Sequence, residues 1–181
     1  MKGASFRPEG SIVFLVDVQT GLRDVIADAD RVIRRGAFLL ECAHRLNISV
    51  RTTEQYPERL GATVPELLPF AGEIRSKREF SAAAGGGLLD RNRHIVVLGV
   101  ETHICVYWTV RDLIEAGHQV TVVSDATSAR TVDRHEEGLA AMRHLGAQTL
   151  HSETVVYGWM ATSTHEAFRD VLALVKGSDG G

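Results

Sequence analysis

The stretch that decides the fold covers residues 95–124 and reads IVVLGVETHICVYWTVRDLIEAGHQVTVVS. It opens with an unbroken apolar run at 95–98, which is typical of a strand buried on both faces. Apolar residues then recur at helical spacing over 104–116, and Gly117 follows as a C-cap glycine would. A second apolar run at 120–123 completes a strand–helix–strand unit, which predicts two parallel strands joined by a right-handed crossover.

Strand and helix patterns alternate on both sides of this unit. Further strands are predicted at 11–16, 48–53, 73–76 and 148–151, and further helices at 30–46, 133–144 and 163–176. Asp30 and Asp133 are the predicted N-caps of the first two of these helices. The alternation indicates a doubly wound α/β fold: a Rossmann-like, six-stranded, mainly parallel sheet flanked by helices.

The composition favours one ordinary globular domain. The chain has 181 residues, of which 44% are hydrophobic, so we expect a single domain over 1–181 with flexible ends at 1–10 and 177–181. A net charge of -3 without a basic cluster argues against a nucleic-acid partner. No apolar run approaches the roughly 20 residues that span a bilayer, and the first ten residues lack the apolar region of a signal peptide. A cytoplasmic protein with no membrane partner is therefore expected.

The only two cysteines, Cys42 and Cys105, show neither metal-ligand spacing nor a CxxC pattern. Cys42 lies within the helical pattern at 30–46 and is predicted to be a core residue. Cys105 falls in the first turn of the helix after the strand at 95–98, where open α/β folds bind ligands. A helix N-terminus lowers the pKa of a thiol, whereas free cysteine is also often a small buried hydrophobe. The residues alone leave both interpretations of Cys105 open.

Two charged residues also follow predicted strands. Asp17 comes directly after the strand at 11–16, in the same layer as Cys105, where burial of a carboxylate is unfavourable without a partner or a task. The alternative is a loop aspartate that caps the next turn. Lys77 follows the strand at 73–76; most lysines are solvated, and the spacing does not decide whether this one points inward.

Four motifs together resemble the isochorismatase-like cysteine hydrolases, which include nicotinamidases, N-carbamoylsarcosine amidohydrolases and ureidoacrylate hydrolases. The motifs, in chain order, are FLVDVQ at 14–19, SKREFSA at 76–82, GVETHICV at 99–106 and VVSDATSAR at 122–130. The resemblance covers roughly residues 11–176. The stretch TTEQYPERLGATVPEL at 52–67 further resembles the isochorismatase domain-containing branch of this family.

The resemblance implies a catalytic triad with Cys105 as nucleophile, Asp17 as base and Lys77 as the cationic member. The cysteine needs an adjacent base or positive charge because a resting thiol is only slightly ionised near neutral pH. The resemblance also implies a cis peptide bond between Val100 and Glu101, and an oxyanion hole formed by the backbone N–H groups of Glu101 and Cys105. The expected reaction is hydrolysis of a C–N bond in a small amide, ureido or carbamoyl compound through a covalent acyl-thioenzyme.

Five residues near the expected pocket are predicted to contact this small-molecule substrate: Gln19, Glu54, Tyr56, Phe80 and His103. For His103, beside the nucleophile, a structural hydrogen bond is the commoner alternative to proton transfer. Asp125, Thr127 and Arg130 follow the strand at 120–123, and they either line the pocket or cap the next helix.

Neither a metal nor another cofactor is expected. Nicotinamidases bind a metal through an Asp-x-His motif after the second strand, but Glu54, Gln55 and Tyr56 stand there, and no histidine follows before His94. Isochorismatases proper cleave a vinyl ether without a cysteine nucleophile, so Cys105 argues against that reaction. The segment after Phe80, which in the family closes over the pocket, looks several residues shorter here.

Quaternary structure and two rival functions complete the expectations. Tyr157 and Trp159 are predicted to lie in a late loop that in this family often reaches a neighbouring subunit, so a homo-oligomer is expected. One rival function is a redox protein whose Cys105 reacts with an oxidant, although Cys42, buried on a helix, is a poor resolving partner. The other is a catalytically silent, oligomeric binding module.

Overall fold

The computed structural model describes residues 6–84 and 93–178. The outer parts of the two predicted flexible ends, and most of the segment after Phe80, lie outside these ranges. The described part of the ends is ordered into a 3₁₀ turn, Pro8–Gly10, and the last turn of the final helix. In the described ranges, no helix is both long enough and apolar enough to span a membrane.

The described residues form one six-stranded sheet in which every pairing is parallel, with the order β3-β2-β1-β4-β5-β6. The strands are β1 (Ser11–Val16), β2 (Ser49–Gln55), β3 (Glu73–Lys77), β4 (His94–Val100), β5 (Gln119–Ser128) and β6 (Gln148–Leu150). All residues of β1 and β4 are buried, as their unbroken apolar runs predict for the centre of a parallel sheet. The predicted doubly wound α/β fold is confirmed.

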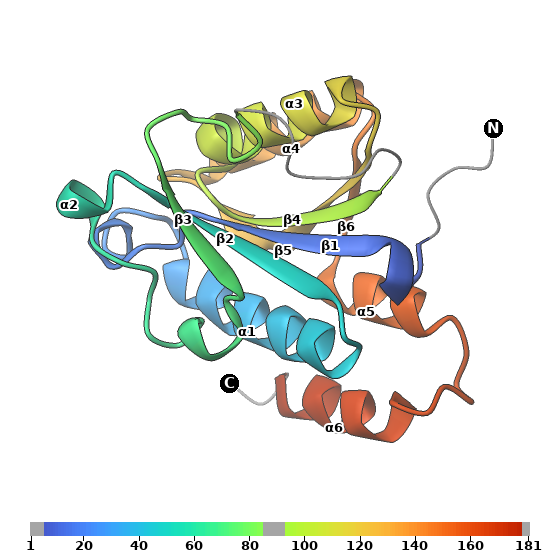
Figure 1. The fold of residues 1–181 in the computed structure, drawn as a ribbon. Coiled ribbons are helices and arrows are strands. Elements are labelled where there is room, and N and C mark those ends of the chain that lie inside the picture. Colours follow the sequence, from blue (N-terminus) through green and yellow to red (C-terminus); the bar gives the residue numbers. More distant parts are fainter. Residues whose placement is uncertain (1–5, 85–92, 179–181) are drawn as a thin grey trace.

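Helices cover both faces of the sheet (Figure 1). One layer contains α1 (Ala29–Arg45), α5 (Ser152–Met160) and α6 (Phe168–Ser178); the other contains α3 (Tyr107–Glu115) and α4 (Val132–His144). A short helix, α2 (Pro57–Leu60), lies in the long connection between β2 and β3. Two hydrophobic clusters, one on each face, form the core.

The predicted late loop around Tyr157 and Trp159 is wrong, because both residues lie in α5. Apolar residues are almost continuous in this nine-residue helix, so it lacks a clear helical period, and Gly158 looks like a helix breaker in the sequence. The structure gives Gly158 a packing role, since a Cβ there would lie 2.5 Å from the ring of Phe6. The final helix begins at Phe168 rather than at the predicted residue 163.

Two predicted N-caps are also wrong by two residues. The N-cap of α1 is Asp28, in a left-handed conformation, and that of α4 is Thr131, whose side chain accepts a hydrogen bond from the Arg134 N–H. Asp30 and Asp133 lie instead in the first turns, where a carboxylate is favoured by the helix dipole. Acidic residues are common at both positions, so the sequence did not distinguish them.

Gly99 allows the two central strands to approach each other at the edge that carries Asp17. It pairs with Val16, its φ is 123°, and a Cβ would lie 2.0 Å from the Val16 carbonyl oxygen. We expect Gly99→Ala to lower the free energy of unfolding by more than about 3 kcal/mol, measured by denaturant unfolding. Gly117→Ala is the matched control because its φ is also positive but nothing lies within 4 Å, so only about 1 to 2 kcal/mol should be lost. Equal losses would contradict the steric argument.

Candidate active site

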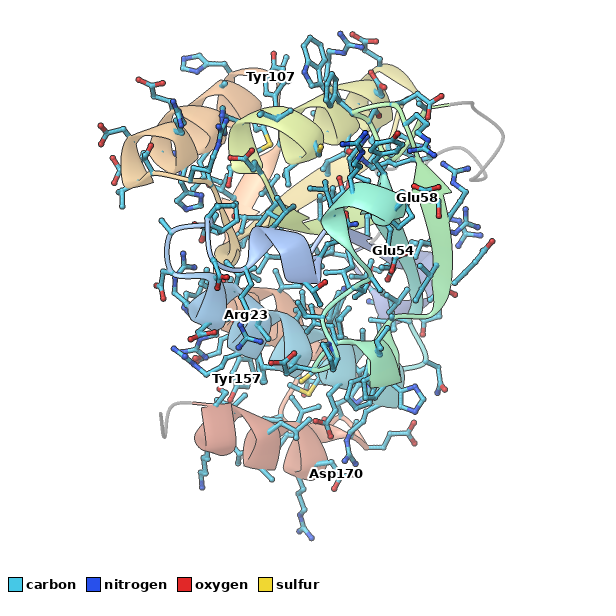
Figure 2. All side chains as sticks on the ribbon, turned by 90° about the vertical axis from the view of Figure 1, so that its left-hand side faces the viewer. Arg23, Glu54, Glu58, Tyr107, Tyr157 and Asp170 are labelled. Atoms are coloured by element: carbon cyan, nitrogen blue, oxygen red, sulfur yellow. The ribbon has the colours of Figure 1, made fainter. Side chains whose placement is uncertain are left out.

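The three triad candidates meet at the carboxyl edge of the sheet. Asp17 follows β1, Lys77 ends β3, and Cys105 lies in a π-helical turn, Thr102–Val106, between β4 and α3. Successive connections from β1 and β4 leave in opposite directions, which is the arrangement that opens a ligand crevice in doubly wound sheets. Figure 2 faces this edge, with Glu54 and Glu58 in view near α2 and Tyr107 in the α3–α4 layer.

Asp17 and Lys77 form a buried ion pair. The Lys77 Nζ atom lies 2.6 Å from Asp17 Oδ2, and the two side chains are only 2% and 1% exposed. The ammonium also lies 2.6 Å from Gln55 Oε1 and 3.2 Å from each of the backbone carbonyls of residues 79 and 80. A buried pair is stable only where its remaining hydrogen-bonding capacity is satisfied, and these contacts meet that condition.

Asp17 has an uncommon backbone conformation and is held in place by Thr53. Its φ is 53°, in the left-handed region that aspartate tolerates better than most residues. The Asp17 N–H donates to the Thr53 carbonyl at 3.1 Å, and Thr53 Oγ1 donates to Asp17 Oδ1 at 2.8 Å. Thr53 therefore fixes both the main chain and the side chain of Asp17.

The Cys105 thiol is buried, and the charges of Asp17 and Lys77 both act on its pKa. Burial, and next the negative charge of Asp17, raise the pKa of Cys105 to about 12, whereas Lys77 acts to lower it. The direction predicted from the helix terminus is therefore wrong, because desolvation and the adjacent carboxylate outweigh the dipole. Burial also raises the pKa of Asp17 above its ordinary value, against the opposing effect of Lys77. A pKa of about 12 leaves the thiol of Cys105 protonated near neutral pH.

The peptide bond between Val100 and Glu101 is cis, as the resemblance implies. The Glu101 carbonyl accepts hydrogen bonds from the N–H groups of Ile104 at 3.0 Å and Val106 at 3.2 Å. Its carboxylate binds Arg130 Nε at 2.8 Å, which places Arg130 beside the turn that carries Cys105. The oxyanion-hole role of the Glu101 and Cys105 N–H groups stays a prediction.

Two of the predicted substrate contacts hold the loop after β2. Gln19 Nε2 donates to the carbonyls of Gln55 at 3.1 Å and Gly61 at 2.6 Å, and its Oε1 accepts from the Gln55 N–H at 2.8 Å. Glu54 Oε1 accepts from the N–H and hydroxyl of Thr63 at 2.7 and 2.9 Å. Both side chains therefore hold the start of the connection between β2 and β3 in place.

The other three predicted contacts are differently placed. Phe80 is 59% exposed, and its backbone carbonyl is one of the acceptors around the Lys77 ammonium. Tyr56 is exposed and carries the guanidinium of Arg78 at 3.7 Å above its ring. Burial lowers the pKa of His103, and its Nδ1 is buried without a hydrogen-bond partner among the described residues. Substrate binding by these residues stays a prediction.

Thr53 and Gln55 contact the triad candidates but are not among the five predicted substrate contacts. Gln55 stands opposite Lys77 in the register between β2 and β3, and Thr53 stands opposite Val16, next to Asp17. Their positions at the carboxyl end of a neighbouring strand were the available signal. Selecting them required the strand register, which the sequence pattern does not give.

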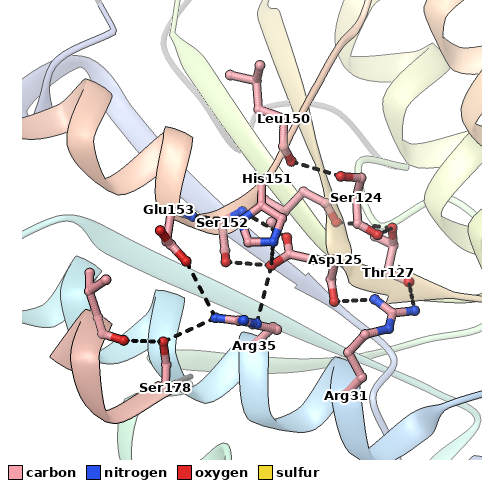
Figure 3. A network of polar contacts seen from close by, with 12 residues as sticks. Arg31, Arg35, Ser124, Asp125, Thr127, Leu150, His151, Ser152, Glu153 and Ser178 are labelled. Atoms are coloured by element: carbon pink, nitrogen blue, oxygen red, sulfur yellow. Dashed lines mark hydrogen bonds and ion pairs between the residues drawn. The ribbon is translucent and has the colours of Figure 1, made fainter. Parts of the chain in front are cut away.

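Asp125 belongs to a separate polar network (Figure 3). It lies within β5, and its carboxylate accepts from the N–H and hydroxyl of Ser152 at 2.8 and 2.6 Å, at the start of α5. His151 Nε2 and Arg35 Nε lie 3.1 and 3.6 Å from the same carboxylate. Thr127 Oγ1 donates to the Val123 carbonyl at 3.1 Å. Asp125 therefore anchors α5 to the sheet, rather than capping the helix that follows β5.

Within the part of the chain that the structure describes, no group of three or more histidine, cysteine, aspartate and glutamate side chains is arranged to hold a metal ion.

Comparison with known proteins places this geometry in a family. The family model described as Isochorismatase domain matches residues 11–154. Isochorismatase domain-containing protein 2A of Mus musculus is 36% identical over 173 residues, covering 93% of this chain and 84% of that protein.

Solved structures show the same fold. A structure described as MAR1 ribonuclease from Caenorhabditis elegans is 30% identical, with a TM-score of 0.89 over 96% of this chain and 93% of its own. YcaC from Pseudomonas aeruginosa, solved with hexane-2,5-diol and covalent acrylamide, is 23% identical, with a TM-score of 0.81 over 96% and 93%. The Escherichia coli YcaC gene product, described as an octameric hydrolase of unknown specificity, is 21% identical, with a TM-score of 0.78 over 96% and 95%. Because the family model matches residues 11–154 and the mouse protein is 36% identical, the chain belongs to the isochorismatase domain family and has its hydrolase fold.

Proposed function

We propose that the protein is a cysteine hydrolase that cleaves the C–N bond of a small amide, ureido or carbamoyl compound without a metal or another cofactor. One observation carries the proposal: the buried Asp17–Lys77 pair and the buried Cys105 both lie at the switch point of the sheet, and both charges act on the pKa of the thiol. Taken singly, the buried ion pair and the buried thiol can each be explained as parts of the folded core. A protonated thiol and a carboxylate with a raised pKa in one buried site form a nucleophile and its base.

The proposed reaction has two stages. Asp17 accepts the thiol proton as Cys105 Sγ forms a bond to the substrate carbonyl carbon, and the oxyanion is stabilised by the N–H groups of Glu101 and Cys105. Asp17 then gives the proton to the leaving nitrogen as the C–N bond breaks, which leaves a thioester. In the second stage, Asp17 accepts a proton from water as the water oxygen attacks the thioester carbon. The C–S bond then breaks, the acid product leaves, and Asp17 returns the proton to the sulfur, which regenerates the thiol. Lys77 holds Asp17 and stabilises the negative charge that passes between the carboxylate and the sulfur.

A relative's chemistry supports a reactive cysteine. The Pseudomonas YcaC structure holds covalent acrylamide, an electrophile that thiolates attack readily. The protonated resting state of Cys105 counts against the redox alternative, since sensor cysteines are typically exposed and of low pKa. The buried charged pair counts against a silent binding module, which would gain nothing from its desolvation.

RNA cleavage is the rival activity, because the Caenorhabditis elegans neighbour is described as a ribonuclease. The net charge of -3 argues against it, since RNA binding depends on neutralising phosphates. Ammonia release from a panel of amides, ureido acids and carbamoyl compounds, beside cleavage of labelled RNA, tests the proposal. RNA cleavage without any C–N hydrolysis would overturn it.

We also propose a homo-oligomer, as the octameric state described for Escherichia coli YcaC supports. Tyr157 and Trp108, both large and exposed on the surface of the single chain, are candidate contacts between copies. Light scattering of the purified protein tests this, and a monomer at micromolar concentration would contradict it. Cytoplasmic location stays a prediction.

Removal of metals should leave turnover unchanged. Asp17 and Lys77 supply the base and the positive charge that a metal would otherwise provide. A compound of the panel that the protein hydrolyses should therefore be turned over at the same rate before and after dialysis of the protein against EDTA. Adding back zinc, manganese or magnesium is the control. A loss of most activity that a metal restores would refute metal independence.

A further inference from the structure

Thr109 joins the nucleophile's turn to the segment that follows β3. It lies on α3, four residues after Cys105, and is fully buried. Its Oγ1 donates to the Cys105 carbonyl at 2.6 Å and accepts from the Ala82 N–H at 2.8 Å. One hydroxyl therefore connects two parts of the chain that are 27 residues apart.

The same segment is held at its other end by Lys77. The ammonium lies 3.2 Å from the Glu79 carbonyl and 3.2 Å from the Phe80 carbonyl, while its third and fourth contacts are Asp17 and Gln55. Residues 79–82 thus lie between the cation of the site and the hydroxyl of Thr109. A shift of this segment would change the position of the Lys77 ammonium.

A hydroxyl that bonds to the carbonyl four residues earlier is common in helices and needs no functional explanation. The second bond is different, because here the Thr109 hydroxyl accepts from the backbone N–H of Ala82, which is far away in the sequence and is itself buried. If the hydroxyl were lost, this N–H would have to remain unpaired or move toward water, and an unpaired buried donor is unfavourable by roughly 1–3 kcal/mol. Movement of the segment is therefore the expected response.

We propose that Thr109 is a positioning residue that fixes the Lys77 ammonium relative to the Cys105 thiol, acting through Ala82 and the carbonyls of Glu79 and Phe80. The proposal rests on the proposed function, in which Lys77 supports ionisation of Cys105. It goes beyond that function because it assigns the relative position of the triad side chains to a residue that touches neither the substrate nor the reacting atoms.

The test is the pH profile of iodoacetamide alkylation at Cys105, followed by peptide mass spectrometry. Thr109→Val should lower the alkylation rate about tenfold at each pH on the rising limb of the profile, which is an upward displacement of about one pH unit, since Lys77 lowers the pKa of Cys105 and would be less well placed. Its kcat should fall about tenfold or more, because small displacements of catalytic groups slow turnover strongly. Thr109→Ser keeps the hydroxyl and should restore both values to within about twofold of the parent.

Thr121→Val is the matched control. Thr121 is also fully buried, and its Oγ1 lies 2.8 Å from His94 Nε2 near the opposite end of the sheet. It should lose stability without a change in the profile. If Thr109→Val does not fold, Thr109→Ala serves instead, because the space it leaves can admit a water to the Ala82 N–H while the direct connection stays lost.

Lys77→Met separates the two possible failures. If Lys77→Met moves the profile but Thr109→Val or Thr109→Ala leaves it as in Thr121→Val, the role of Thr109 is overturned and the proposed function stands. If neither the lysine variant nor the threonine variants move the profile, the coupling of Cys105 to Lys77 is absent, and the proposed function fails as well.

Discussion

Cys105→Ala is expected to abolish C–N hydrolysis, with kcat/KM falling by at least about a thousandfold, while the protein remains folded. Alanine cannot form the thioester, and neither Asp17 nor Lys77 offers an alternative nucleophile in the ion-paired state. The fold should persist because the change removes one small buried group outside the central strands. Ammonia release measures the activity, and circular dichroism with thermal unfolding measures the fold.

Cys42→Ala is the matched control for this experiment. Burial raises the pKa of Cys42 to about 12, and the residue lies on the buried face of α1, away from the ion pair. Its replacement should lower stability modestly and leave kcat/KM within about twofold of the parent. Residual activity of Cys105→Ala above a few per cent, or an equal loss in Cys42→Ala, would show that Cys105 is not the nucleophile.

The sequence predicted the frame of the site because that frame depends on long-range rules with few exceptions. Unbroken apolar runs identified β1 and β4 as central strands, and parallel pairing required their carboxyl ends to meet at one edge. Asp17 and Cys105 follow these two strands, so their proximity followed from topology. Lys77 was less certain, since only the resemblance indicated that it points inward.

Other features depended on contacts that no local pattern encodes. Helix α5 is apolar on most sides and contains Gly158, whose role appears only when Phe6 is packed against it. Gln55 became a partner of Lys77 through the register of β2 with β3. Thr109 resembled an ordinary helical threonine until residue 82 was placed beside it.

The ionisation of Cys105 was the least predictable feature. The helix-terminus rule indicated a lower pKa, but burial and Asp17 reverse the direction and raise the pKa to about 12. The helix-terminus rule describes one contribution to the pKa of Cys105, whereas the direction of the total shift depends on all the groups that surround the sulfur. In the proposed mechanism, Asp17 therefore removes the thiol proton during the attack, rather than stabilising a thiolate that already exists.

Asp17→Asn should therefore change turnover and alkylation in opposite directions. Asparagine cannot accept the thiol proton or deliver it to the leaving nitrogen, so kcat should fall by about a thousandfold. The charge of Asp17 raises the pKa of Cys105, so its removal leaves Lys77 as the dominant neighbouring charge. The pH profile of iodoacetamide alkylation should then move to lower pH than in the parent. Asparagine is close in shape to aspartate and can still accept the hydrogen bond of Thr53.

Asp125→Asn is the control for the loss of a largely buried carboxylate elsewhere. Asp125 holds the start of α5 through Ser152, so its replacement should lower stability while the alkylation profile of Cys105 stays unchanged. Unfolding would also expose the thiol, move its profile to lower pH toward that of a free cysteine and abolish turnover, so circular dichroism must first show that both variants are folded. With the fold retained, a profile at lower pH together with lost turnover in Asp17→Asn alone distinguishes a general base from a residue that only maintains the fold. An Asp17→Asn profile displaced to higher pH would mean that the carboxylate favours ionisation of the thiol, and the proposed proton transfer to Asp17 would have to be abandoned.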